Sequence, residues 1–153
     1  MGSGKREERG VTSPHPLLLL DTHIWLWFAL GDASRLSTTI QKKIEAAAHG
    51  GRLAVSSISA WEIGILEAKG RIALGMPCEK WVAAALALPG LRLIGLEPEI
   101  AIASSRLPGE IHGDPADRIL TATARAFDAV LATADERLVE YGNAGFMRVL
   151  DVR

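Results

Sequence analysis

Five short apolar blocks stand out in the pattern of hydrophobic and polar positions along the chain. They are rich in Leu, Val, Ile and Ala, which is typical of strands that are buried on both faces. The blocks are LLLL at 17–20, RLAVSS at 52–57, LRLIGL at 91–96, AVLAT at 129–133 and MRVLDV at 147–152. We predict a strand in each, although the first block alone would be ambiguous between strand and helix.

Segments with helical patterns fill the intervals between these blocks. Their ends carry start signals such as Ser37 or Thr38 and stop signals such as Gly50. The predicted helices lie at 37–50, 59–70, 77–90, 98–109, 114–127 and 135–142. Strands that alternate with helices indicate a parallel sheet covered on both sides. We therefore expect an α/β protein, a three-layer α/β/α sandwich with a central parallel sheet of about five strands.

Length and composition fit one globular domain. The chain has 153 residues, of which 48% are hydrophobic and 23% charged, and its formal net charge is −1. Residues 1–16 are polar and rich in Gly and Pro, so we expect them to be disordered or partly derived from an expression vector. Residues 17–153 are then a single domain. A near-neutral chain offers no global attraction to nucleic acid, so any such function needs a local site.

Two absences in the sequence bear on localisation. The single cysteine, Cys78, has no intramolecular disulfide partner, which fits a reducing compartment. No stretch approaches the roughly 20 apolar residues that a membrane span requires, and Leu17–Leu20 is too short for a signal-peptide core. We expect a cytoplasmic protein with no membrane partner.

Four carboxylates fall where predicted strands end or predicted helices begin. Asp21 follows the first strand, Glu62 lies in the first turn of the helix predicted from residue 59, Asp117 is in the helix start DPAD, and Asp135 follows AVLAT. Ligands of open α/β folds gather at the carboxyl ends of the strands. If the sheet is parallel, we therefore expect at least three of these acids to share one edge of it.

Helix capping is the structural alternative for each acid. Ser59 and Glu62 match a capping box, and Asp114 followed by Pro115 is a sound helix start. Asp135 could also be a plain N-cap. Asp21 fits this alternative least well, because the neighbouring Thr22 could cap a following helix equally well.

Gathered carboxylates would need a counter-charge. Two carboxylates about 4 Å apart repel by roughly 4 kcal/mol at an effective dielectric constant near 20. Arg118 is the only basic residue close to these motifs in the sequence. A hard divalent cation bound through oxygen atoms, Mg²⁺ or Mn²⁺, is the simplest solution. One cysteine and four scattered histidines show no spacing for zinc.

Four segments resemble the PIN-domain ribonucleases, and above all the toxins of VapBC-type bacterial toxin–antitoxin pairs. They are LLLLDTHIWLW, SSISAWEIGILEAKGRI, HGDPADRILTATA and AVLATADERL, and the resemblance extends over residues 17–152. It implies an Mg²⁺- or Mn²⁺-dependent endoribonuclease that acts as the toxin of such a pair. The implied partners are an RNA substrate, a cognate antitoxin protein and a second copy of the chain in a homodimer.

The resemblance also assigns residues to the site. The catalytic and metal-binding quartet is implied to be Asp21, Glu62, Asp117 and Asp135. Asp117 is chosen over Asp114 because it directly precedes Arg118, and Asp114 is interpreted as a supporting residue and helix cap. Thr22 and Thr133 are implied to orient carboxylates through their hydroxyl groups. His112 is interpreted as a loop residue.

Two other functions remain open at this point. The acids could be helix caps of a non-catalytic protein-binding module. The chain could also be a phosphatase in which Asp21 is the nucleophile, but that class expects a second acid two residues later, where this sequence has His23. A cation-dependent gain in melting temperature would separate the nuclease from the binding module.

Overall fold

The structure, a computed structural model, describes residues 15–153 and contains one sheet of five parallel strands. All but the last two residues of the segment 1–16, which we expected to be disordered, lie outside the described residues. The strands are β1 (Leu18–Leu20), β2 (Leu53–Ser56), β3 (Leu91–Ile94), β4 (Val130–Thr133) and β5 (Arg148–Asp151). Each lies within one of the five apolar blocks, so the predicted strands are confirmed.

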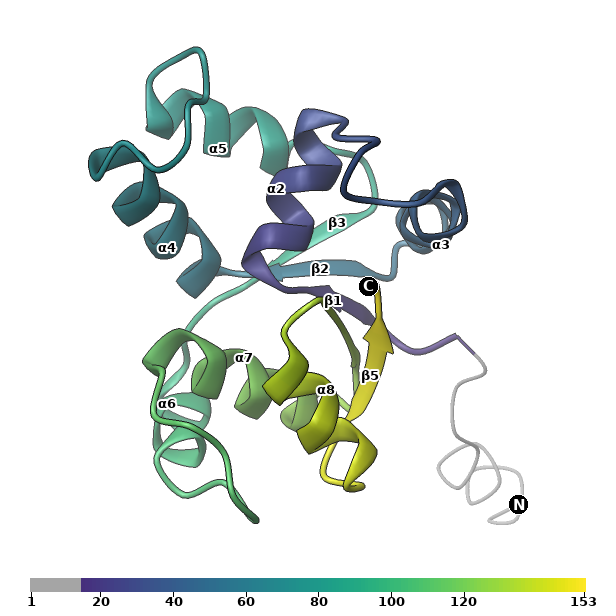
Figure 1. Ribbon diagram of the computed structural model, residues 1–153, viewed down its shortest axis with the longest axis vertical. Coiled ribbons are helices and arrows are strands. Elements are labelled where there is room, and N and C mark those ends of the chain that lie inside the picture. Colours follow the sequence, from purple (N-terminus) through teal and green to yellow (C-terminus); the bar gives the residue numbers. More distant parts are fainter. Residues whose placement is uncertain (1–14) are drawn as a thin grey trace, which may run out of the picture.

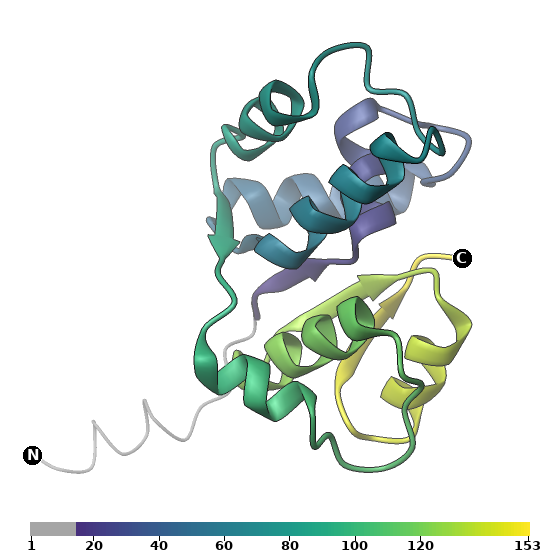
Figure 2. The same cartoon turned by 90° about the vertical axis from the view of Figure 1, so that its left-hand side faces the viewer.

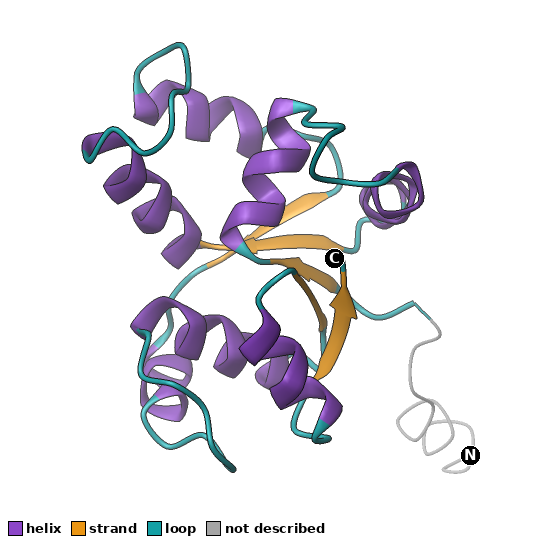
Figure 3. Cartoon of the chain, viewed as in Figure 1, coloured by secondary structure: helices purple, strands orange, loops and turns teal. Residues whose placement is uncertain are grey.

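Seven helices of the described chain form two layers around this sheet. They are α2 (Thr22–Leu30), α3 (Thr38–His49), α4 (Ser57–Ala68), α5 (Cys78–Leu86), α6 (Pro98–Ser104), α7 (Pro115–Ala126) and α8 (Glu136–Asn143). Helices α2 to α5 cover one face, and α6 to α8 cover the other (Figure 1). Colouring by secondary structure shows the strands between the two helical layers (Figure 3). The predicted α/β/α sandwich is confirmed.

Alternate residues of the strands supply two separate cores. Leu18 and Leu20 pack with Val55 on the side of α2 to α5, whereas Leu19 and Leu131 pack on the side of α6 to α8. Leu19 and Leu20 are fully buried, and burying a leucine side chain stabilises a fold by about 1.5–3 kcal/mol. Burial on both faces explains why these blocks are continuously apolar rather than alternating.

The strand order places a crevice at the carboxyl ends of β1 and β4. The order is β3-β2-β1-β4-β5, so the chain proceeds from β1 in one direction to β2 and β3 and then crosses to β4 on the other side. A side view separates the first half of the chain from the second on either side of the sheet (Figure 2). The boundary between β1 and β4 is a topological switch point, where open α/β sheets bind ligands.

The start of α4 differs from the prediction. The N-cap is Ser56, whose hydroxyl accepts a hydrogen bond from the backbone N–H of Ile58 at 3.1 Å. Strand β2 ends at Ser56, so the chain turns there, and the N-cap lies three residues earlier than the predicted Ser59. The predicted capping box of Ser59 and Glu62 is therefore wrong. Glu62 lies in the second turn of α4, not the first, and Ser59 is fully buried within the helix.

Among residues 15–153, no helix has both the length and the apolar character needed to cross a membrane. Cys78, at the start of α5, is a free thiol.

Candidate active site

A polar cavity of about 350 Å³ opens at the switch point. Five acids line it, Asp21, Glu62, Asp114, Asp117 and Asp135, together with His23, Trp27, Ala134 and Arg137. All four acids of the predicted quartet are therefore in one cavity, although they come from four separate segments of the chain. We expected at least three of them at one edge of the sheet, and all four line this cavity.

Asp21 caps α2 and faces the cavity at the same time. Its Oδ1 atom accepts a hydrogen bond from the backbone N–H of Thr22 at 2.7 Å, and its Oδ2 atom accepts one from Thr133 Oγ1 at 2.7 Å. The residue is buried. Burial raises the pKa of its carboxyl group, and the bonds from Thr133 and Thr22 oppose that rise.

Thr133 joins the ends of β1 and β4. Its hydroxyl donates to Asp21 and accepts from the backbone N–H of Asp135 at 3.0 Å. The backbone N–H of Asp21 also donates to the carbonyl of Ala132 at 3.0 Å. These bonds fix the relative positions of two acids, so Thr133 lies where the sequence predicted an orienting hydroxyl.

Glu62 is held by a chain of two hydroxyl groups. Thr22 Oγ1 lies 2.5 Å from Glu62 Oε1 and 2.8 Å from Ser59 Oγ. The Thr22 hydroxyl has one proton, so when Glu62 is ionised that proton points to the carboxylate and Ser59 donates to Thr22. Burial is the main cause that raises the pKa of Glu62. We did not predict Ser59 for the site, because we had assigned it to the helix cap.

Asp114 and Asp135 are both helix caps. Asp114 Oδ1 accepts from the backbone N–H of Asp117 at 2.9 Å at the start of α7. Asp135 Oδ1 accepts from the N–H groups of Arg137 and Leu138 at the start of α8. The capping interpretation of Asp114 is confirmed, and Asp135 combines a cap with a place on the cavity wall.

Asp117 is the least compensated acid of the cavity. Its pKa is raised to about 8, first by burial and then by the negative charges of neighbouring acids, beginning with Asp21. Within residues 15–153, its side chain accepts no hydrogen bond, and the imidazole of His112 lies beside it, with Nε2 3.3 Å from Oδ2. A carboxylate in these surroundings is costly to ionise without added positive charge.

The nearby arginines supply little of that charge. Arg137 Nη2 lies 3.7 Å from Asp135 Oδ2, but the Arg137 side chain is 62% exposed, and exposed pairs contribute little. Arg118 donates to the carbonyl oxygens of Ser104, Ile111 and His112, and therefore not to the acids. A set of carboxylate oxygens with a charge deficit fits a hard divalent cation.

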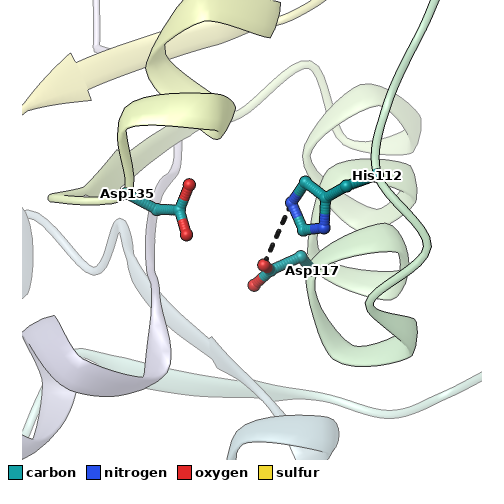
Figure 4. A group of neighbouring side chains, drawn as sticks. All are labelled: His112, Asp117 and Asp135. Carbon is teal, nitrogen blue, oxygen red and sulfur yellow. Dashed lines mark ion pairs between the residues drawn. The ribbon is translucent and has the colours of Figure 1, made fainter.

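One compact group of possible ligand atoms lies on the α7 and α8 side of the cavity. Atoms of His112, Asp117 and Asp135 are all within 4.8 Å of one another. Their side chains point toward a common space between the two helices (Figure 4). We did not predict His112 for this group, because the path of its loop is not visible in local sequence patterns.

A larger cavity of about 800 Å³ adjoins the acidic one and shares Arg137 with it. His112 and Arg118 line this larger cavity, as do the stacked rings of Tyr141 and Phe146, whose centroids are 4.9 Å apart. Arg137 is the only residue that lines both cavities. The chemistry suggested by clustered carboxylates therefore belongs to the smaller cavity.

The fold and the acidic switch-point cavity together are typical of one family of proteins. The PIN domain model matches residues 18–144, and the chain belongs to the PIN-domain family. It is 36% identical over 121 residues to Ribonuclease VapC22 of Mycobacterium tuberculosis, a match that covers 79% of this chain and 88% of that protein. Membership of this family gives no support to the alternative of an aspartate-nucleophile phosphatase.

Solved structures show the same fold. A chain of VapBC2 from Rickettsia felis, bound to a DNA fragment from its promoter, superposes with a TM-score of 0.65 and 16% identity over 90% of this chain and 99% of that chain. A chain of DNA-bound VapBC from Salmonella typhimurium gives a TM-score of 0.63 and 17% identity, with the same coverage of both chains. Identities this low bear on the fold alone.

Proposed function

We propose that this protein is an Mg²⁺- or Mn²⁺-dependent endoribonuclease that acts as the toxin of a toxin–antitoxin pair. The observation that carries the proposal is the single cavity in which Asp21, Glu62, Asp117 and Asp135 meet at the switch point of a PIN-domain fold. Similarity to a protein named as a VapC ribonuclease supports RNA as the substrate.

The four acids take different parts in this proposal. Asp21 and Asp117 would hold the cation, and Glu62 and Asp135 would complete its surroundings. When bound, the cation would offset the charge of the carboxylates and the phosphodiester and make water a stronger nucleophile. Without it, the same acids repel RNA.

The hydroxyl groups around the cavity keep the acids in place. Thr133 holds Oδ2 of Asp21, and Thr22 holds Oε1 of Glu62. Each bond occupies one carboxylate oxygen with a donor and limits the rotation of that carboxylate. Such partners of ligating groups typically affect metal affinity or activity by about 10–100-fold.

Capping alone does not account for the cavity. Asp21, Asp114 and Asp135 each accept a backbone N–H at a helix start, as a structural role requires. Glu62 and Asp117 accept no backbone N–H from any described residue, yet both are on the cavity wall. A non-catalytic binding module gives no reason for these two carboxylates to be there.

The proposal includes partners and a location. An antitoxin protein is the expected inhibitor, because similar chains occur in complexes named VapBC. Exposed apolar side chains, among them Trp61 at 54%, are available for the antitoxin or for a second copy in a homodimer. A cytoplasmic location fits an RNA substrate and a free Cys78 thiol.

Cleavage of RNA by the purified protein tests the proposal. We expect cleavage with Mg²⁺ or Mn²⁺, none with EDTA, and none from Asp21→Asn, which removes one charge from the cavity. Asp128→Asn is the matched control, because Asp128 is an exposed acid that pairs with Arg148 and lies outside the cavity. Equal cleavage by folded Asp21→Asn and wild-type protein would show that the assignment is wrong.

A further inference from the structure

We propose that His112 is a positioning residue for Asp117, and that its neutral imidazole donates a hydrogen bond from Nε2 to Oδ2 of that carboxylate. This inference rests on the proposed cation site and adds a residue to it. Nε2 of His112 lies 3.3 Å from Asp117 Oδ2, and each of the two side chains is only 15% exposed. The two side chains face one another across the gap between their segments (Figure 4).

The backbone next to His112 determines which ring nitrogen carries the proton. The N–H of Asp114 points to His112 Nδ1 at 3.3 Å, so Nδ1 is the acceptor. A neutral imidazole has one acceptor nitrogen and one donor nitrogen. With Nδ1 accepting, the proton is on Nε2, which is the atom that faces Asp117.

The N–H group at Nε2 has no other acceptor among the described residues. The atom is buried, and no acceptor in residues 15–153 is aligned with it as a hydrogen-bond partner. A buried donor left without a partner costs about 1–3 kcal/mol. Asp117 Oδ2, at 3.3 Å, is the acceptor that Nε2 faces.

Arg118 holds the loop that carries His112. Its Nε donates to the carbonyl of Ser104 at 2.9 Å, and its Nη1 donates to those of Ile111 and His112 at 3.3 and 3.4 Å. The loop between α6 and α7 is thereby tied to α7 immediately beside Asp117. The short motif HGDPADR thus contains the donor, the cap, the acid and the residue that fixes the loop.

Direct ligation of the cation by His112 is the competing explanation. A ligating Nε2 must present its lone pair, which would move the proton of a neutral ring to Nδ1. That proton would then face the N–H of Asp114 at a donor–donor distance of 3.3 Å, which is unfavourable. The two roles also differ in ion preference, because an imidazole ligand favours Mn²⁺ over Mg²⁺.

Cation binding without RNA tests the proposal and does not depend on activity. We would measure the affinities for Mn²⁺ and Mg²⁺ by calorimetry on wild type, His112→Gln, His112→Asn and His112→Leu. The amide nitrogen of glutamine reaches about as far as Nε2, whereas that of asparagine reaches only about as far as Nδ1. His49→Leu is the matched control, since His49 is an exposed residue at the end of α3.

We expect His112→Leu and His112→Asn to bind both ions about 10–100-fold more weakly, and His112→Gln to stay within about threefold of wild type. The Gln and Asn pair keeps the test valid if the Leu variant fails to fold. Wild-type affinity in His112→Asn would overturn the proposal, and a loss confined to Mn²⁺ would indicate ligation instead. No cation binding by the wild type would contradict the proposed function itself, which distinguishes the two failures.

Discussion

The hydroxyl group of Thr133 lies between the ends of β1 and β4, at the point where the acids meet. It donates to Asp21 and accepts from the N–H of Asp135, and the residue is fully buried. Replacing it by an apolar group of similar shape removes both bonds and leaves the N–H without that partner. Such losses in buried sites cost about 1–3 kcal/mol.

We therefore expect Thr133→Val to lower the free energy of unfolding by about 1–3 kcal/mol and also to weaken cation binding. Thr123→Val is the control, because Thr123 is equally buried but its hydroxyl donates only to the carbonyl of Ile119 within α7. Denaturant unfolding with and without Mn²⁺ measures both effects. Unchanged Mn²⁺ affinity in Thr133→Val would exclude an orienting role for this hydroxyl.

At the level of helices and strands, the start of α7 separates capping from site chemistry. Asp114 caps the helix through a 2.9 Å bond to the N–H of Asp117, and it also lines the acidic cavity. Its charge contributes to the raised pKa values of Asp117 and Glu62. The residue therefore stabilises the helix while adding to the charge that a cation must offset.

Two substitutions of Asp114 test whether its capping role can be separated from its contribution to the charge of the cavity. Asp114→Ala should cost about 0.5–2 kcal/mol of stability, because the cap is lost, whereas Asp114→Asn should keep the cap. We expect Asp114→Asn to retain most cation affinity, since the carboxylates assigned to the cation remain. Thermal unfolding and calorimetry would measure the two quantities, and equal destabilisation by Ala and Asn would contradict a capping role.

The starts of α7 and α4 differ in how well the sequence predicted them. DPAD predicted the start of α7 correctly, because Asp followed by Pro has one favourable arrangement there. Ser56, Ser57 and Ser59 can all cap a helix, and only the end of β2 selects Ser56. His112 was missed as a site residue because the path of its loop depends on hydrogen bonds from Arg118 to the carbonyl groups of Ser104 and Ile111, fourteen and seven residues away.

For the molecule as a whole, the uncompensated charge at the cavity makes stability depend on pH. The pKa of Asp117 is raised to about 8, while that of an unfolded aspartate is about 3.9. Between these values the folded protein retains a proton that the unfolded chain has lost. Without cation, the contribution of Asp117 to the free energy of unfolding is therefore fully present below about pH 4. This contribution is lost as the pH rises toward 8. The raised pKa values of Asp21 and Glu62 act in the same direction.

A cation competes with these protons, so the increase in melting temperature on adding Mg²⁺ or Mn²⁺ should grow between pH 5 and about pH 8. Thermal unfolding over this range, with and without 
cation, measures the effect. In Asp117→Asn, the fall in stability with pH should be smaller and the gain from cation should largely disappear. A cation response that does not vary with pH in the wild type would contradict the charge argument.

The architecture could be predicted because the patterns that determine it recur along the whole chain. Five apolar blocks and the helical segments between them determine the sandwich, and an error at the start of α4 does not change the sheet. The four acids were predictable as a group because parallel strands bring their carboxyl ends to one edge. The hydroxyl chain from Ser59 to Glu62 was not, since it depends on how α2 packs beside α4.

In the proposed function, the carboxylates of the switch-point cavity bind at least one divalent cation. The most direct measurement is the anomalous scattering of crystals grown or soaked with Mn²⁺. We predict a strong peak within the cavity that marks Mn²⁺ bound to oxygens of Asp21 and Asp117. This peak should disappear in Asp21→Asn crystals prepared in the same way. Ordered Mn²⁺ only outside this cavity, or an ordered cavity with no peak at saturating Mn²⁺, would contradict the account.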